Sequence, residues 1–183
     1  MRVVVTGVPG VGKTTVMEKT AQKAGVKIVN FGTVMFEHAR KEGLIEHRDE
    51  LRNLPLDVNR KLQEQAAEEI RKMGDVMIDT HATIKTPNGY WVGLPYHVLV
   101  RLQPDVIVLI EVASSEILKR RNSDPTRQRD SDTIEIIEEH QMMNRAAAVS
   151  YAMICGGCVK IVRNEEGLAD KAADDIAGLF LKK

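Results

Sequence analysis

The chain has 183 residues, enough for one domain, and its 43% hydrophobic and 28% charged residues are typical of a globular protein. Its 26 Lys and Arg residues balance 26 Asp and Glu residues, and this zero net charge argues against a nucleic-acid coat protein. The apolar runs are much shorter than the roughly 18 residues that span a membrane. Only two cysteines are present, so we expect a cytoplasmic protein rather than a disulfide-stapled secreted one.

Short β-branched runs alternate with longer helical patterns along the chain. Runs of this kind are typical of strands that are buried on both faces of a parallel sheet. We expect strands at 3–5, 26–29, 76–78, 106–110 and 159–162, and helical patterns at 13–23, 55–73, 115–121, 132–154 and 168–181. This order favours an α/β fold with right-handed crossovers. Residues 31–54 mix helix and loop signals, and residues 122–131 are polar, so ligand-binding loops are expected there.

A phosphate-binding loop is the clearest motif. The sequence from Gly7 to Thr14, GVPGVGKT, matches G-x-x-x-x-G-K-[ST] and lies between an expected strand and an expected helix. In such a loop successive backbone N–H groups face a phosphate, and the helix N-terminus adds positive charge. Lys13 is expected at the β- and γ-phosphates, with the Thr14 hydroxyl on Mg²⁺. The predicted ATP-binding residues are Gly7, Val8, Pro9, Gly10, Val11, Gly12, Lys13, Thr14 and Thr15.

A carboxylate ends the third expected strand. Asp79 follows an apolar run, and in P-loop proteins such an aspartate helps to hold Mg²⁺, often through water. The alternative is that Asp79 caps the next segment. His81 either contacts substrate or is an ordinary histidine at the end of a strand, and both readings stay open.

Arginines are concentrated late in the chain. A charge run is usually one solvated helix face, but here Pro125 interrupts it, so its members cannot all share one face. Arginines stabilise the charge that spreads over a transferring phosphoryl group, and a closing segment could bring them to it. The cluster consists of Lys119, Arg120, Arg121, Arg127 and Arg129, and Arg145 follows in the next helical pattern.

The segment after the second strand and the segment after Asp79 both overhang the expected cleft. Among the arginines of the first segment, Arg52 fits a ligand-binding role and an ordinary surface role equally well. Arg40 and Arg48 are more typical of surface arginines. In the second, Lys85 is a candidate phosphate ligand, and Tyr90 with Trp91 either flanks a base or fills the core. The pair Cys155 and Cys158 has no second ligand pair nearby, so a plain structural role is expected.

Taken together, these motifs resemble the archaeal adenylate kinases, and the resemblance covers essentially the whole chain. The Asp-Thr-His segment with its Thr-Pro-x-Gly-Tyr turn is a narrower signal than the phosphate loop. The resemblance is carried by residues 5–15, 30–33, 48–52, 79–81, 85–90, 93–95, 126–130 and 144–145.

The resemblance implies one P-loop kinase domain over 1–183, with a five-stranded parallel sheet flanked by helices, an NMP-binding region at about 30–73 and a short lid at about 122–131. It implies transfer of a phosphoryl group from MgATP to AMP, giving two ADP, and a homotrimer. Arg121, Arg127, Arg129 and Arg145 would gather round the transferring group. Thr33 stands where bacterial-type enzymes have Asp. The predicted AMP-binding residues are Asn30, Gly32, Thr33, Arg52, His81, Lys85 and Tyr90.

Two other functions stay open. A kinase of another nucleoside monophosphate, or of a shikimate- or gluconate-like metabolite, is the first, and a hydroxyl acceptor would require a carboxylate base, for which Asp79 is the candidate. A nucleotide-dependent switch is the second. It is disfavoured because Asn-Lys-x-Asp is absent and Asp175–Gly178, which has the spacing Asp-x-x-Gly, falls in the C-terminal helical pattern.

Overall fold

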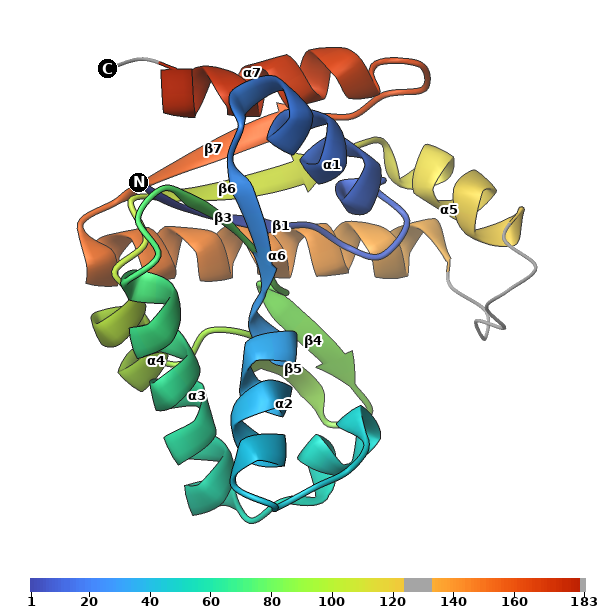
Figure 1. Cartoon of the computed structure of the whole chain (residues 1–183). Helices are drawn as coiled ribbons and strands as arrows, with labels where there is room; N and C mark the ends of the chain where they lie inside the picture. The colour runs from blue at the N-terminus through green and yellow to red at the C-terminus, as the bar shows by residue number, and fades with distance from the viewer. Residues whose placement is uncertain (124–132, 182–183) are drawn as a thin grey trace.

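The computed structural model describes residues 1–123 and 133–181, and a parallel sheet forms the centre of this part of the chain (Figure 1). All five expected strands belong to this sheet, which confirms the predicted α/β fold. In spatial order the strands are β2 (Lys27–Asn30), β3 (Val76–Asp79), β1 (Arg2–Thr6), β6 (Val106–Glu111) and β7 (Cys158–Arg163).

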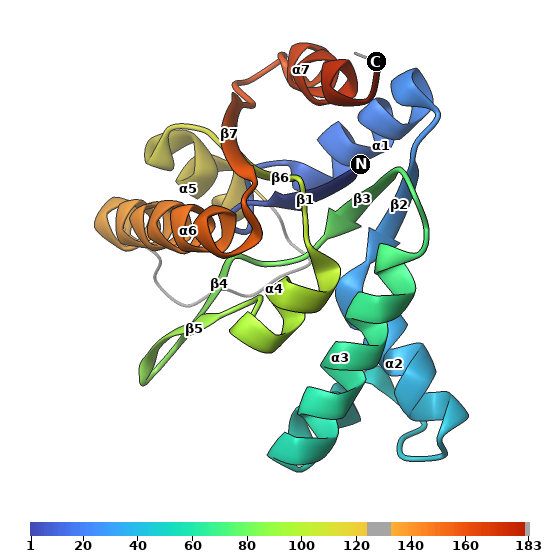
Figure 2. The same cartoon turned by 90° about the vertical axis from the view of Figure 1, so that its left-hand side faces the viewer.

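Two helical layers cover the sheet because its strands are apolar on both faces. Along β1, Val3 and Val5 pack into one core and Val4 packs into the other. The first core joins the sheet to α1 (Lys13–Ala24), α5 (Ser114–Asn122) and α7 (Ala169–Leu181). The second joins it to α3 (Leu56–Arg71), α4 (Tyr96–Leu102) and α6 (Ile134–Cys155), and Figure 2 shows these layers on opposite sides.

The region after β2, where the sequence signals were mixed, contains two helical pieces. Helix α2 (Phe31–Lys41) begins at once, because the Asn30 side chain caps it by accepting a hydrogen bond from the Thr33 N–H. A 3₁₀ turn, η1 (Arg48–Asn53), then leads to α3. Gly32 and Thr33 are weak helix formers in the first turn, so the cap and the buried face of α2 decide the start of the helix.

A β-hairpin that the sequence analysis did not identify follows the third strand. Strand β4 (Thr83–Thr86) pairs antiparallel with β5 (Gly89–Val92) around a Pro87-Asn88 turn. Its base is fixed to α6, where the buried Asn144 Oδ1 accepts from the Thr83 N–H at 3.1 Å and from the Thr83 hydroxyl at 2.6 Å. The Tyr151 hydroxyl also donates to the Ala82 carbonyl at 2.6 Å. Helix α6 therefore holds the hairpin in place.

Cys155 and Cys158 are free thiols, and burial raises the pKa of Cys155. Within residues 1–123 and 133–181, no helix combines the length and the apolar composition that a bilayer crossing requires.

The hydrogen bonds between Asn144 and the base of the hairpin can be tested by measuring the free energy of unfolding. We predict that Asn144→Ala lowers the free energy of unfolding by about 1–3 kcal/mol, because it leaves two buried Thr83 donors without their acceptor. Urea unfolding measures this change. Ser150→Ala, which removes an exposed hydroxyl from the same helix, is the control and should change stability by less than about 0.5 kcal/mol. Equal effects of the two substitutions would contradict the prediction.

Candidate active site

The phosphate-binding loop connects β1 to α1 and is held tightly from behind. Gly12 has a φ of +82°, and a Cβ there would lie 2.5 Å from the Asn164 side-chain nitrogen, so glycine is required. The Val11 carbonyl accepts hydrogen bonds from Asn164 Nδ2 at 2.7 Å and from Arg120 at 3.2 Å. These bonds fix the loop backbone before any phosphate arrives.

A cavity of about 780 Å³ opens in front of this loop. One end is walled by the loop, and the other is walled by α2, η1, α3 and the start of the hairpin. The predicted site residues that line it are Gly7, Val8, Pro9, Gly10, Val11, Gly12, Lys13, Thr14, Thr15, Asn30, Gly32, Asp79, His81 and Arg121.

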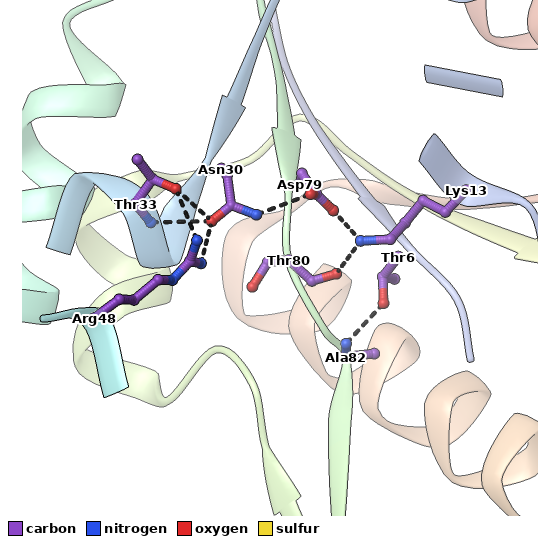
Figure 3. Close-up of polar contacts among 8 residues, drawn as sticks. All are labelled: Thr6, Lys13, Asn30, Thr33, Arg48, Asp79, Thr80 and Ala82. Carbon is purple, nitrogen blue, oxygen red and sulfur yellow. Dashed lines mark hydrogen bonds and ion pairs between the residues drawn. The ribbon is translucent and has the colours of Figure 1, made fainter. Parts of the chain in front are cut away.

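The centre of the cavity carries a chain of polar contacts (Figure 3). The Lys13 ammonium forms an ion pair with Asp79 Oδ1 and donates to the Thr80 carbonyl at 3.2 Å. Asp79 Oδ2 accepts from the Asn30 side-chain amide at 2.9 Å. Parallel pairing produces this arrangement, because Asp79 lies opposite Val5 in β1 and opposite Asn30 in β2.

On the side away from Asp79, Asn30 continues this chain to Arg48. Asn30 Oδ1 accepts from the Thr33 N–H at 3.0 Å, from the Thr33 hydroxyl at 3.1 Å and from Arg48 at 2.9 Å. Arg48 also donates to the Thr33 hydroxyl at 3.2 Å and lines the cavity. The structure thus places in the cleft an arginine that sequence reasoning had assigned to the surface.

Arg52 takes the surface position instead. Its side chain is 73% exposed and pairs with Asp49 at 2.8 Å within the same short turn. The local i, i+3 pairing with Asp49 accounts for this placement. Nothing in the spacing of Arg48 and Arg52 separates the two, because the difference arises only when η1 packs beside α2.

The late arginines have three different placements. Arg121 lines the cavity, and its Nε donates to the Pro9 carbonyl at 2.8 Å. Arg127 and Arg129 lie outside the described residues. Arg145 binds Glu111 through two hydrogen bonds of 2.8 and 2.7 Å, because that carboxylate is only 3% exposed and requires a counter-charge. Arg145 is therefore directed to Glu111, and not into the cleft as the sequence predicted.

The residues predicted between β3 and β5 separate into two groups. His81 and Lys85 line a second cavity of about 320 Å³, which Arg121 and His140 share. Tyr90 instead faces α6, where its hydroxyl donates to Glu139 at 2.7 Å, and burial together with Glu139 raises the pKa of Tyr90. Desolvation by the surrounding protein lowers the pKa of His81, and the positive charge of Lys13 lowers it further. The His81 ring is therefore neutral at pH 7.

The donor set in the cleft fits Mg²⁺ bound together with a nucleotide. Thr14 and Asp79 both line the cavity in which phosphates would lie. Mg²⁺ is usually held by one or two carboxylates or hydroxyls and by substrate phosphates, with water completing the shell. In the described part of the chain no group of three His, Cys, Asp or Glu side chains could hold a metal alone. Thr14 and Asp79 are therefore the candidate ligands.

A phosphate loop on a parallel sheet, facing an arginine-bearing cleft, defines a P-loop kinase fold. The structure is similar to shikimate kinase from Bacteroides thetaiotaomicron, with a TM-score of 0.59 and 14% identity over 98% of this chain and 97% of that one. It is also similar to shikimate kinase from Acinetobacter baumannii in complex with shikimate, with a TM-score of 0.58, 16% identity and coverage of 98% and 92%. At these identities the likeness establishes the fold.

Sequence comparison gives the family. A family profile described as an AAA domain matches residues 6–138. The chain is 52% identical to the adenylate kinase of Thermoplasma acidophilum over 96% of both chains, and 52% identical to that of Methanocaldococcus jannaschii over 95% of both. It is 48% identical to that of Pyrococcus furiosus, covering 98% of this chain and 93% of the relative. The chain belongs to the archaeal adenylate kinase family, which confirms the resemblance.

Proposed function

We propose that the chain catalyses the reversible transfer of a phosphoryl group from MgATP to AMP, giving two molecules of ADP. The observation that carries the proposal is the continuous polar chain from Lys13 through Asp79 and Asn30 to Arg48. It connects a donor-phosphate site at one end of the cleft with a second cationic site at the other. A kinase whose acceptor is itself a phosphate requires such a pair of sites.

At the donor end, the backbone of Gly7–Thr15 would surround the β- and γ-phosphates of ATP, and Lys13 would leave Asp79 to bind them. Thr14 and Asp79 would hold Mg²⁺, which would neutralise charge on the phosphate oxygens. Arg121 lies at the mouth of the loop, where it would stabilise the transferring group. We propose that Arg127 and Arg129 also stabilise the transferring group, as expected from the sequence.

At the acceptor end, the guanidinium of Arg48 would bind the AMP phosphate. Asn30 and Thr33 orient that guanidinium, and Gly32 leaves room for it, since a Cβ on Gly32 would lie 2.8 Å from an Arg48 nitrogen. Lys85 lines the second cavity, which shares His81 and Arg121 with the main one, and would have to leave Glu139 to reach AMP. His81 would serve as a neutral hydrogen-bonding group. Within this proposal Arg52 and Tyr90 have no contact with AMP.

The chemistry needs no general base. An oxygen of the AMP phosphate attacks the γ-phosphorus, and the bond from that phosphorus to the bridging oxygen of the leaving ADP breaks. The acceptor oxygen is already anionic, so the protein has only to align the reactants and neutralise charge. Asp79 suits this scheme, because one of its oxygens accepts a hydrogen bond from Asn30 and the carboxylate would hold Mg²⁺ together with Thr14, so it is not needed as a base.

We also propose that the enzyme is a cytoplasmic homotrimer of single-domain chains, with an NMP-binding region at about 30–73 and a lid at about 122–131. An exposed stripe on α6 supports self-association. Met142, Val149 and Met153 are 63%, 52% and 80% exposed, and with Ala146 they recur at intervals of four, three and four residues. This spacing is typical of the seam between packed helices.

The reaction is tested by phosphorus NMR of the protein with MgATP and one acceptor at a time: AMP, UMP, CMP, GMP, shikimate or gluconate. We expect ADP to form rapidly with AMP and little turnover of the other acceptors. Turnover of a hydroxyl acceptor in preference to AMP would contradict the proposal and assign Asp79 the role of base.

The two neighbouring arginines of η1 form a matched pair of variants. We predict that Arg48→Ala raises the KM for AMP about 10- to 100-fold, because it removes charge-assisted hydrogen bonds to the acceptor phosphate. Arg52→Ala removes an equal charge from the exposed side of the turn and should change that KM less than about twofold. Steady-state kinetics with AMP varied measures both. If Arg52→Ala alone raised the KM for AMP, Arg52 and not Arg48 would be the residue that binds the AMP phosphate.

The α6 stripe is tested by changing its most exposed member. We predict that Met153→Glu converts a trimer into monomers, because a charge in an apolar helix seam is left without water or a partner. Light scattering coupled to size-exclusion chromatography measures the mass, and Leu181→Glu, at another exposed apolar position, is the control. A Met153→Glu protein that remains trimeric would place the interface elsewhere.

A further inference from the structure

The β4–β5 hairpin has two unlike faces. Its antiparallel register pairs Lys85 with Tyr90 and Ile84 with Trp91. The first pair faces α6, because the Tyr90 hydroxyl donates to Glu139 at 2.7 Å and the Lys85 ammonium lies 3.6 Å from the same carboxylate. Since successive side chains on a strand point to opposite faces, Ile84 and Trp91 lie on the other face of the hairpin. Ile84 also reaches the second cavity, which it lines together with Ile137 and His140 of α6.

The face that carries Ile84 and Trp91 looks onto the acceptor end of the cleft. Ile84 lines the main cavity together with Met35 of α2 and Gln63 of α3, which stand on the facing wall. In Figure 2 the hairpin lies below α6, and α2 and α3 lie to its right. Trp91 pairs with Ile84 across the hairpin, so its side chain lies beside Ile84 on the same face and extends that apolar surface beyond the residues that line the cavity.

This face of the hairpin leaves two large apolar side chains in contact with solvent. The Trp91 side chain is 64% exposed and Ile84 is 48% exposed, and both are apolar. A contiguous apolar surface beside a polar phosphate site is a typical arrangement for binding a flat, amphipathic ligand. A nucleotide held by its phosphate at Arg48 would extend its sugar and base toward this rim.

We propose that the Trp91 indole, supported by Ile84, is the platform on which the base of the acceptor nucleotide stacks, and that Trp91 helps to select the acceptor. This inference rests on the proposed function, because it requires a nucleotide acceptor whose phosphate is bound near Arg48. Stacking on an aromatic face uses the π-surface of the base and not its hydrogen-bonding edge. Trp91 therefore favours purines over pyrimidines by area and contributes little to the distinction between adenine and guanine.

The tryptophan itself reports on the contact, because it is the only one in the chain. We expect AMP to quench or shift the emission of the wild-type protein, since its base covers the indole. Ribose 5-phosphate, which carries the phosphate and sugar without a base, should compete with AMP and leave the emission unchanged. An equal response to both ligands, or calorimetric binding of AMP without a change in emission, would overturn the proposal.

Substitutions give a second test. Trp91→Leu should raise the KM for AMP about tenfold and leave unchanged both the KM for ATP and the inhibition constant of ribose 5-phosphate. Trp91→Phe keeps an aromatic face, so its KM for AMP should stay close to that of the wild-type protein. Tyr96→Leu, at a 68% exposed aromatic on α4, is the matched control and should change none of these constants. An unaltered KM for AMP in Trp91→Leu would overturn the proposal.

Two further outcomes separate the possible failures. A wild-type protein that turns over no AMP would refute the proposed function itself. A protein that turns over AMP, but whose emission depends on protein concentration and not on AMP, would assign Trp91 to a contact between copies and overturn the stacking proposal alone.

Discussion

The parallel pairing of β1, β3 and β2 is the constraint on which the site depends. This register places Asp79 opposite Val5 on one side and opposite Asn30 on the other. The carboxyl ends of the three strands therefore meet at one edge of the sheet, where the phosphate loop also begins. A slip of one residue would turn the Asp79 side chain to the opposite face and separate it from Lys13. The two helical layers and their cores serve to hold this register.

Asn30 joins local structure to the site, because one side chain has three tasks. Its Oδ1 caps α2 through the Thr33 N–H and also orients Arg48, and its amide nitrogen binds Asp79. The direction in which α2 leaves the sheet is thus tied to the position of the acceptor-side cation. This coupling explains why a region with weak helix signals has a defined arrangement, since the polar contacts at its start stabilise what propensity alone does not.

Charge in the sequence indicates a region of the chain, but it does not show where each arginine side chain will lie. The sequence indicates arginines near a phosphate site, and Arg121 lies where that reasoning placed it. Arg145 is instead bound to the buried Glu111, and Arg52 to its neighbour Asp49. Arg145 is directed by a carboxylate that the fold buries, and no pattern in the sequence reveals which carboxylates will be buried. Arg52 is directed by an exposed carboxylate three residues before it in the same turn.

The sequence by itself determined the α/β fold, the order of strands and helices, the phosphate loop and the family. These features depend on local patterns: hydrophobic periodicity, and a motif whose backbone geometry is fixed by its own glycines. Tertiary structure alone decided that Arg48 and not Arg52 faces the cleft, that Tyr90 turns to α6, and that Trp91 lies exposed on the opposite face of the hairpin, beside Ile84. Each of these depends on which face of a turn or a hairpin packs against a distant element, and such packing is a property of the assembled chain.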